Sequence, residues 1–379
     1  MNTHQASFAL AALCVALAPC ASAQTTWVVS SYGGAQFTQV QPAVDAAAPG
    51  DTILVQPGFY SAVTIDKGVL VLASQARMTT LLGANITVRD VPAGQRAVVR
   101  GFITMLRSGP AAEIEVRDCA GSVHLDRLRA THVVDIRRSP HVSLRDVTTA
   151  VGELHVEDST VTATDCRFRG ATVSMNQYGL FCRNSQVTAA GCQFRGGDGN
   201  PFQPVPWEGV LLDGGLLVLA GTDSVVAAGT SPFAPTLGTS AIEARSGTLT
   251  IDPGVTLLPT NGAPAVRGAA TTAIAPVADT RTDVSDGILT GTLNAPGATF
   301  AWLIADVPVL RPLATPFGSL WVGPTSVVVA AAPPGPSGEL TASVGVAGLP
   351  PGFTVVLQGA VRRGSTLALA TPAVTTVEE

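Results

Sequence analysis

The sequence predicts an all-β fold in two parts: a solenoid, in which the chain winds around an axis, and a small antiparallel β-sandwich. Three observations predict it. Residues 37–72 combine one short amphipathic stretch with three short apolar runs separated by tight turns. A degenerate repeat follows between residues 113 and 196. Beyond about residue 270 the apolar runs become longer and have the spacing of hairpins.

The composition agrees with many short strands and turns. Of the 379 residues, 46% are hydrophobic and 13% are charged, with 39 Gly and 27 Pro. A disordered chain would carry more charge and fewer aliphatic residues. The formal net charge of −5 gives no indication of a nucleic acid or an anionic membrane surface as a partner.

Residues 1–23 are predicted to be a secretory signal peptide. Residues 8–18 form an apolar core, and Ala21-Ser22-Ala23 is a small-residue cleavage site. The apolar run is shorter than the ~20 residues that span a bilayer. We therefore expect an exported protein, secreted or at the cell surface, without a membrane span. Cys20 leaves a lipoprotein anchor open, although Pro19 directly before it makes a poor lipobox.

The amphipathic stretch at the front is expected to form a helix of about three turns that closes the solenoid. Phe37, Val40, Val44 and Ala47 recur at helical spacing, and Pro49-Gly50 ends the helix. Apolar runs at residues 52–55, 63–65 and 69–72 then predict the first strands of the coil.

This front segment resembles the entry segment of right-handed parallel β-helix proteins, the pectate-lyase-like superfamily. The likeness is carried by the phrase GDTILVQPGFY, from Gly50 to Tyr60, together with the helix before it. The resemblance implies a right-handed parallel β-helix with an N-terminal capping helix. Because the entry phrase occurs in enzymes and in non-enzymes, the resemblance implies a fold and not an activity.

The repeat is clearest where Glu157–Gly170 recurs as Arg183–Gly196, with eight of fourteen positions matching by type at an offset of 26 residues. Val123–Leu128 and Val142–Val147 share the same frame at an offset of 19 residues. One coil per repeat is predicted, with Val and Ala pointing inward before a corner and Cys and Phe pointing inward after it. The additional residues of longer repeats are expected in the loop that joins two strands of one coil.

Residues 24–270 are thus predicted to form the β-helix, and residues 271–379 a C-terminal β-sandwich module. Strands are expected at residues 287–293, 299–305, 326–332, 339–346, 353–361 and 367–374. Phe317–Val322 and Val356–Val361 resemble the C-terminal modules of secreted β-helix proteins from environmental bacteria, notably planctomycetes.

Four cysteines follow the predicted signal peptide: Cys119, Cys166, Cys182 and Cys192. Cys166 and Cys192 hold equivalent repeat positions, so we expect them on adjacent coils about 4.8 Å apart. A disulfide needs Cβ atoms about 3.8 Å apart. Buried thiols are therefore favoured, and disulfides stay open because the protein is expected to be exported. No Cys-x-x-Cys pair occurs, so no metal site is predicted.

The largest irregular segment inside the repeats, residues 196–209, is the leading candidate for binding. Trp207 and Phe202 offer flat apolar faces that could stack on sugar rings. Asp198 and Glu208 offer acceptors for sugar hydroxyls, or for Ca²⁺ as the one cofactor left open. The alternative is that the two rings only fix the loop against the coil.

The charge-rich zone from residue 113 to residue 195 holds ten arginines and ten acidic residues. This balance indicates ladders of ion pairs on a solvated wall. β-Elimination needs a base beside a neutralised uronate carboxylate. The one tight cluster with those ingredients is Asp135, Arg137, Arg138 and His141. The Asp-Asp pair and the Asn-x-Asp phrase of the β-helix glycosidases are not found in the sequence.

The sequence therefore predicts a secreted or cell-surface β-helix protein with a binding, adhesion or structural role, and with a polysaccharide or cell-surface glycan as its partner. The alternative is a polysaccharide lyase or glycoside hydrolase that acts in a groove on the β-helix wall. The identity of the ligand and the oligomeric state stay open.

Overall fold

The computed structural model describes residues 24–74, 79–82, 85–105, 113–171, 178–309, 313–315, 318–349 and 353–377. The predicted signal peptide and Cys20 lie outside these residues, as does Phe317. The chain divides into two compact units, of which the first is Thr25–Ala275 and the second begins at Pro276.

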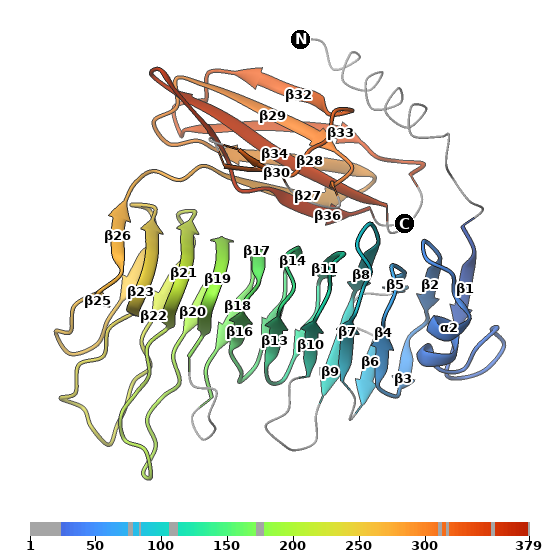
Figure 1. Ribbon diagram of the computed structural model, residues 1–379, viewed down its shortest axis with the longest axis horizontal. Helices are drawn as coiled ribbons and strands as arrows, with labels where there is room; N and C mark the ends of the chain where they lie inside the picture. The colour runs from blue at the N-terminus through green and yellow to red at the C-terminus, as the bar shows by residue number, and fades with distance from the viewer. Residues whose placement is uncertain are drawn as a thin grey trace. The chain divides into compact units, whose positions relative to one another are not determined.

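The first unit is a parallel β-helix in which each coil contributes a strand to each of three faces (Figure 1). The first and second faces count as one 17-stranded sheet, because three long strands bend across the corner between them. The third face is a separate 9-stranded sheet. The all-β fold and the β-helix that the sequence predicts are confirmed.

The first face consists of β4 (Val63–Ile65), β7 (Ile86–Arg89), β10 (Ile114–Arg117), β13 (Val134–Arg137), β16 (Leu154–Glu157), the first halves of β19 (Leu180–Ala190), β21 (Val210–Ala220) and β23 (Ile242–Ile251), and β25 (Val266–Gly268). The second consists of β1 (Thr26–Val29), β2 (Thr52–Val55), β5 (Leu70–Ala73), β8 (Arg96–Arg100), β11 (Ser122–Asp126), β14 (Val142–Arg145), β17 (Thr160–Thr164), the second halves of the long strands, and β26 (Thr271–Ile274). The third consists of β3 (Gly58–Tyr60), β6 (Thr79–Leu82), β9 (Phe102–Met105), β12 (Arg129–Ala130), β15 (Thr148–Thr149), β18 (Arg167–Arg169), β20 (Gln193–Arg195), β22 (Val225–Ala227) and β24 (Thr256–Leu258).

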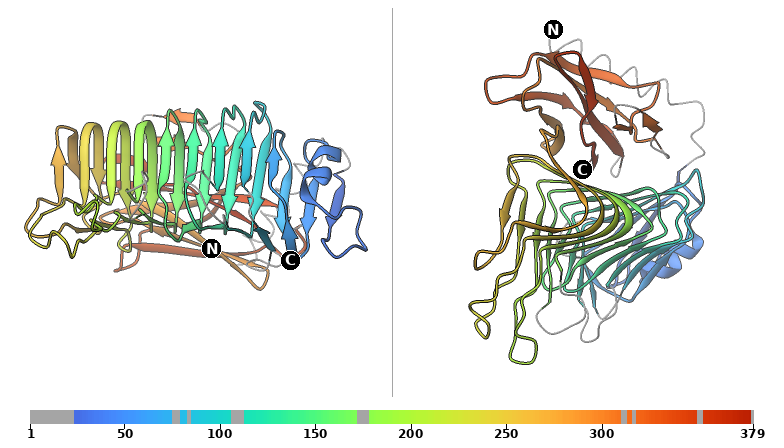
Figure 2. Two further views of the ribbon diagram at one scale, coloured as in Figure 1. Left: turned by 90° about the horizontal axis from the view of Figure 1, so that it is seen from below. Right: turned by 60° about the vertical axis from the view of Figure 1, so that its left-hand side comes forward.

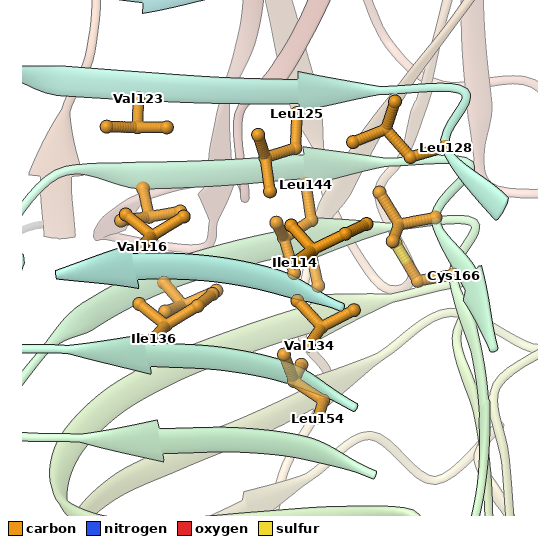
Figure 3. Packing of buried hydrophobic residues seen from close by; sticks show 14 of the residues in the cluster. Ile114, Val116, Val123, Leu125, Leu128, Val134, Ile136, Leu144, Leu154 and Cys166 are labelled. Carbon is orange, nitrogen blue, oxygen red and sulfur yellow. The ribbon is translucent and has the colours of Figure 1, made fainter. Parts of the chain in front are cut away.

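Alternation along each strand fills the interior with aliphatic side chains that stack from coil to coil. Figure 3 shows the row of Ile114, Val134 and Leu154 on the first face and the neighbouring row of Val116 and Ile136. All five side chains are fully buried. The predicted repeat sets this register, since residues at an offset of 26 pair directly in β17–β19 and in β18–β20. The rings at the equivalent positions Phe168 and Phe194 stack 5.9 Å apart.

The corner between the first and second faces has a recurring construction. Its first residue has positive φ, between 45° and 56°, in Asp118, Arg138, Asp158 and Asn184. The following serines, Ser139, Ser159 and Ser185, each accept a hydrogen bond from the backbone N–H one coil earlier, at 3.0–3.2 Å. Each serine also donates to the carbonyl two residues before it. These bonds satisfy polar backbone groups inside the coil.

The capping helix α2 spans Val40–Ala46 and is shorter than predicted. Val40, Ala43 and Val44 are buried, as the helical spacing predicts. Phe37 is not part of the helix, because its backbone pairs with β1: its N–H donates to Val28 O and its carbonyl accepts from Ser30 N. The ring of Phe37 instead packs edge-on against Trp27.

All four cysteines of the described chain are buried and free. Cys166 and Cys192 lie on adjacent coils at equivalent positions, directly before β18 and β20. Burial raises the pKa of the Cys166 thiol well above its usual value, and the neighbouring Cys192 acts in the same direction. The preference for buried thiols is thus confirmed.

The second unit is a β-sandwich. One sheet contains β27 (Asp279–Ser285), β28 (Ile288–Asn294) and β33 (Glu339–Gly345). The other contains β32 (Val327–Ala332), β29 (Phe300–Asp306), β34 (Thr354–Arg363), β35 (Thr366–Leu369) and β36 (Ala373–Thr376), and β30 (Leu313–Thr315) pairs with β31 (Gly318–Leu320). The strands of both sheets pair antiparallel, and Leu293, Leu303 and Leu357 belong to one buried cluster. Strand β27 was not predicted, and the predicted strand 367–374 is divided into β35 and β36.

The two units meet in sequence after β26, which still pairs with β23 in the parallel sheet. The coil therefore continues past residue 270, where the sequence placed the boundary. Within the described residues, no helix has the length and apolarity needed to cross a bilayer.

Candidate functional site

Outward-facing side chains on the first face form a ladder of ion pairs. Arg137 Nε lies 2.9 Å from Asp135 Oδ1 on the same strand, and Arg137 Nη1 lies 3.9 Å from Glu157 Oε2 on the next coil. Arg183 Nη1 lies 3.4 Å from Glu157 Oε1 one coil further. The predicted ion-pair ladder is confirmed, and pairs of this exposed kind each contribute little to stability.

The predicted catalytic cluster is distributed over the corner of one coil. Asp135 and Arg137 face outward from the first face. Arg138 is the corner residue, and its guanidinium binds Asp118 of the preceding coil through two contacts, at 2.6 and 3.0 Å. His141 directly precedes β14 on the second face. Because both arginines bind carboxylates of the chain, neither is available to neutralise a uronate without first giving up its partner.

The predicted binding segment, residues 196–209, is anchored at its start by Asp198. Its carboxylate accepts hydrogen bonds from Arg169 Nη2 and Arg195 Nη2, both at 2.9 Å, and from Thr230 N at 2.8 Å. Partial burial opposes ionisation, but the bonds from Thr230, Arg169 and Arg195 outweigh it and lower the pKa of Asp198. With two guanidinium groups on it, this carboxylate serves as a structural anchor and is poorly suited to bind Ca²⁺.

The end of the same segment lies at the first face, where Trp207 and Glu208 come together with residues of other coils. The indole of Trp207 is half-buried and meets the ring of Tyr178 edge-on, with centroids 5.3 Å apart. The buried carboxylate of Glu208 lies 2.5 Å from Arg267 Nη2. The same nitrogen lies 2.9 Å from Glu243 Oε2, and Arg245 Nε lies 2.8 Å from Glu243 Oε1. We call Tyr178, Trp207, Glu208, Glu243, Arg245 and Arg267 the Trp207 cluster.

The register of the coils builds this cluster. Gly179 N donates to Gly209 O at 2.8 Å, which aligns Tyr178 and Glu208, the residues two positions before β19 and β21. A Cβ at Gly209 would crowd the backbone of the third face at Ala227. Glu243 and Arg267 are direct cross-strand partners on β23 and β25. The long side chain of Arg267 thus passes Glu243 and reaches Glu208, which lies two coils before it.

The pKa values of the two carboxyl groups are shifted in opposite directions. Burial raises the pKa of Glu208, although Arg267 opposes the shift. Burial also acts on Glu243, but hydrogen bonds from Arg245 and Arg267 outweigh it and lower the pKa of that carboxyl. Burial and the neighbouring Glu208 raise the pKa of Tyr178 to about 12. At neutral pH Tyr178 is therefore a hydroxyl group, and Glu243 is a charged acceptor.

The outward-facing ring of Phe181 on β19 is covered by two neighbouring side chains of the protein. The imidazole of His155 stacks on it with centroids 4.6 Å apart, and the guanidinium of Arg183 lies 5.0 Å from its centroid. Phe202, the other aromatic residue predicted to bind sugar, lies at the tip of the loop with its side chain 97% exposed. Trp207 is therefore the ring of the predicted pair that lies in a polar cluster.

The structure thus separates the four predicted binding residues. Trp207 and Glu208 belong to one cluster, whereas Asp198 anchors the loop to the third face and Phe202 stands alone at the tip. Tyr178, Glu243, Arg245 and Arg267 were not predicted. The sequence feature that could have identified them is the pair Glu243 and Arg245, which lie at outward positions of a strand that otherwise has the pattern of an ordinary β-helix strand.

Among the described residues, no group of three or more His, Cys, Asp or Glu side chains is placed to hold a metal ion. A comparison of the chain with protein-family models finds no match, and a comparison with curated proteins finds none either.

Proposed function

We propose that the protein is an exported β-helix protein that binds carbohydrate through the Trp207 cluster, in a binding or adhesion role. The observation that carries the proposal is the half-buried indole of Trp207, which meets Tyr178 edge-on beside a network of carboxylates and guanidinium groups. A flat apolar ring beside several fixed donors and acceptors matches a sugar, which has apolar C–H faces and hydroxyl edges.

The charges of the cluster favour a neutral glycan. Two carboxylates, Glu208 and Glu243, face two guanidinium groups, Arg245 and Arg267, at 2.5–2.9 Å. These groups satisfy one another, so a ligand gains hydrogen bonds and does not need to supply a charge. The predicted signal peptide supports export.

Affinity electrophoresis in gels that contain neutral or uronate-rich polysaccharides tests the proposal. We expect a neutral polysaccharide to retard the protein, and Trp207→Ala to weaken this binding at least tenfold. Phe59→Ala on the third face is the matched control, since Phe59 is an exposed aromatic residue outside the cluster. Retention of full binding by Trp207→Ala, or no retardation by any polysaccharide, would contradict the proposal.

A second candidate function, glycoside hydrolysis, is favoured by one observation. Glu208 and Glu243 lie on neighbouring coils, contact the same nitrogen of Arg267, and have pKa values shifted in opposite directions. Two carboxyl groups with such separated protonation can act as acid and base or nucleophile. Release of reducing ends that Glu208→Gln abolishes while binding persists would establish this activity. Binding without turnover would leave carbohydrate binding alone.

A further inference from the structure

Two successive loops project from the corner between the third and first faces (Figure 2). They are residues 196–209, between β20 and β21, and residues 228–241, between β22 and β23. Each carries two exposed apolar side chains. We call these four the apolar fin: Phe202 (97% exposed), Val205 (49%), Phe233 (54%) and Leu237 (40%).

The apolar fin lies in a part of the chain without charges. No charged residue occurs between Asp198 and Glu208, and none occurs between Asp223 and Glu243. The wall of the coil between residues 113 and 195 carries twenty arginines and acidic residues in 83 positions, or about one in four. Exposed aromatic and aliphatic side chains on the uncharged tips of projecting loops are uncommon on a surface that faces only water.

The two loops hold each other in place, so the fin is preformed. Gly199 N donates to Thr230 O at 2.9 Å, and Gly229 N donates to Trp207 O at 2.8 Å. Asp198 adds the hydrogen bond from Thr230 N described above. Binding through the fin therefore requires little ordering of the chain.

Side chains in the loop tips accept hydrogen bonds from four of the backbone donors there. Asn200 Oδ1 accepts hydrogen bonds from Phe202 N and Gln203 N, both at 2.9 Å. Ser231 Oγ plays the same part for Phe233 N and Ala234 N, both at 3.2 Å. Five further positions are prolines, which have no N–H to satisfy: Pro201, Pro204, Pro206, Pro232 and Pro235. A segment with satisfied donors can leave water at a lower cost than an ordinary loop.

The size of the fin decides between its possible occupants. A stable protein–protein interface buries about 800 Å² on each partner, and four side chains on two loop tips cannot supply that area. The interfacial region of a bilayer accepts a few apolar side chains at a time and needs no shape match. We propose that the apolar fin inserts into the interface of a lipid bilayer, and that this insertion does not depend on anionic lipids because the tips carry no positive charge.

The test uses the full chain with vesicles of zwitterionic phosphatidylcholine. We expect the protein to pellet with the vesicles in proportion to lipid concentration, and the pelleted fraction to be the same at low and high salt. The double variant Phe202→Ser/Phe233→Ser should reduce the apparent partition coefficient at least fivefold. Phe59→Ser is the matched control and should pellet like the wild type, because Phe59 is similarly exposed (58%) but lies on β3.

The depth to which residue 202 enters the bilayer is tested with Phe202→Trp and vesicles of lipids with brominated acyl chains. Quenching of the new indole beyond that seen for the wild type is expected, and Phe59→Trp should show no such increase. Unchanged pelleting of the double variant, pelleting only with anionic lipid, or no pelleting at millimolar lipid would each overturn the proposal. The proposal would also be overturned if sedimentation velocity showed the wild type as a dimer and the double variant as a monomer, since a second copy of the chain would then occupy the fin. Glycan binding of the double variant should stay unchanged, which separates this proposal from the proposed function.

Discussion

At the scale of single residues, Asp198 shows how one carboxylate holds a long loop in place. Its pKa is lowered in the folded state, so its contribution to stability is present above its unfolded pKa, near 3.8, and is lost as the pH falls through the folded value. We expect Asp198→Asn to lower the free energy of unfolding by about 2 kcal/mol at pH 7, because hydrogen bonds to a charged group are weakened. Urea denaturation of both proteins at pH 7 and below pH 3.8 measures this difference.

The difference between the wild type and Asp198→Asn should shrink at the acidic pH. The matched control is Asp66→Asn, a change at an exposed turn after β4 that should cost little at either pH. An equal loss of stability at both pH values would show that the carboxylate charge is not what anchors the loop.

Arg267 is the second residue whose part can be isolated, because it is the partner of a buried carboxylate. Arg267→Ala leaves Glu208 buried without its guanidinium partner, and we expect a loss of about 1–3 kcal/mol in the free energy of unfolding. The double variant Arg267→Ala/Glu208→Gln should recover most of that loss, since the buried group is then neutral. If the two losses simply add in a double-mutant cycle measured by urea denaturation, the contact does not couple the two residues.

At the scale of elements, the corner between the first and second faces sets how closely the coils can stack. Gly215 has φ of +85° and lies on Ser185 of the preceding coil, so a Cβ there would overlap the Ser185 carbonyl oxygen. Gly50 has a similar φ of +97°, but a Cβ there would meet nothing within 4 Å. Gly50→Ala should therefore cost only the backbone strain of about 1–2 kcal/mol, whereas Gly215→Ala should cost clearly more.

Thermal and urea unfolding of the two glycine variants compares the two costs directly. Equal losses of stability would mean that the coils can move apart at this corner, and that the hydrogen bonds of Ser139, Ser159 and Ser185 do not hold them together.

The same elements explain which parts of the fold the sequence can predict. Two repeats that match by residue type at an offset of 26 pair at that same offset, so the pairings Val161 with Val187 and Phe168 with Phe194 follow from the sequence. The start of α2 does not, because the backbone of Phe37 pairs with β1 although its side chain fits the helical spacing. Local periodicity thus predicts strands and their register, and a tertiary pairing decides where the helix begins.

At the scale of the whole molecule, the candidate site lies beyond the reach of sequence patterns. The contact between Glu208 and Arg267 joins residues 59 positions apart, and two loops of unequal length separate them. No period relates these loops, so the alignment of Tyr178, Glu208 and Arg267 appears only when the coils are stacked. Asp198 and Glu208 are ten residues apart in sequence, yet their partners lie on different faces of the β-helix.

The boundary between the two units gives the last prediction, because each unit has its own buried core. One cluster of buried residues runs from Val29 to Val255, and the clusters of the sandwich begin at Ala278. We therefore expect residues 25–275, produced alone, to give the circular dichroism of a β protein and to unfold cooperatively in urea. Residues 25–270 lack β26, which leaves the second half of β23 as an unpaired edge, and should unfold at lower urea and associate on size-exclusion chromatography. Equal stability of the two fragments would show that β26 adds nothing to the coil, and failure of both to fold would show that the β-helix depends on the sandwich.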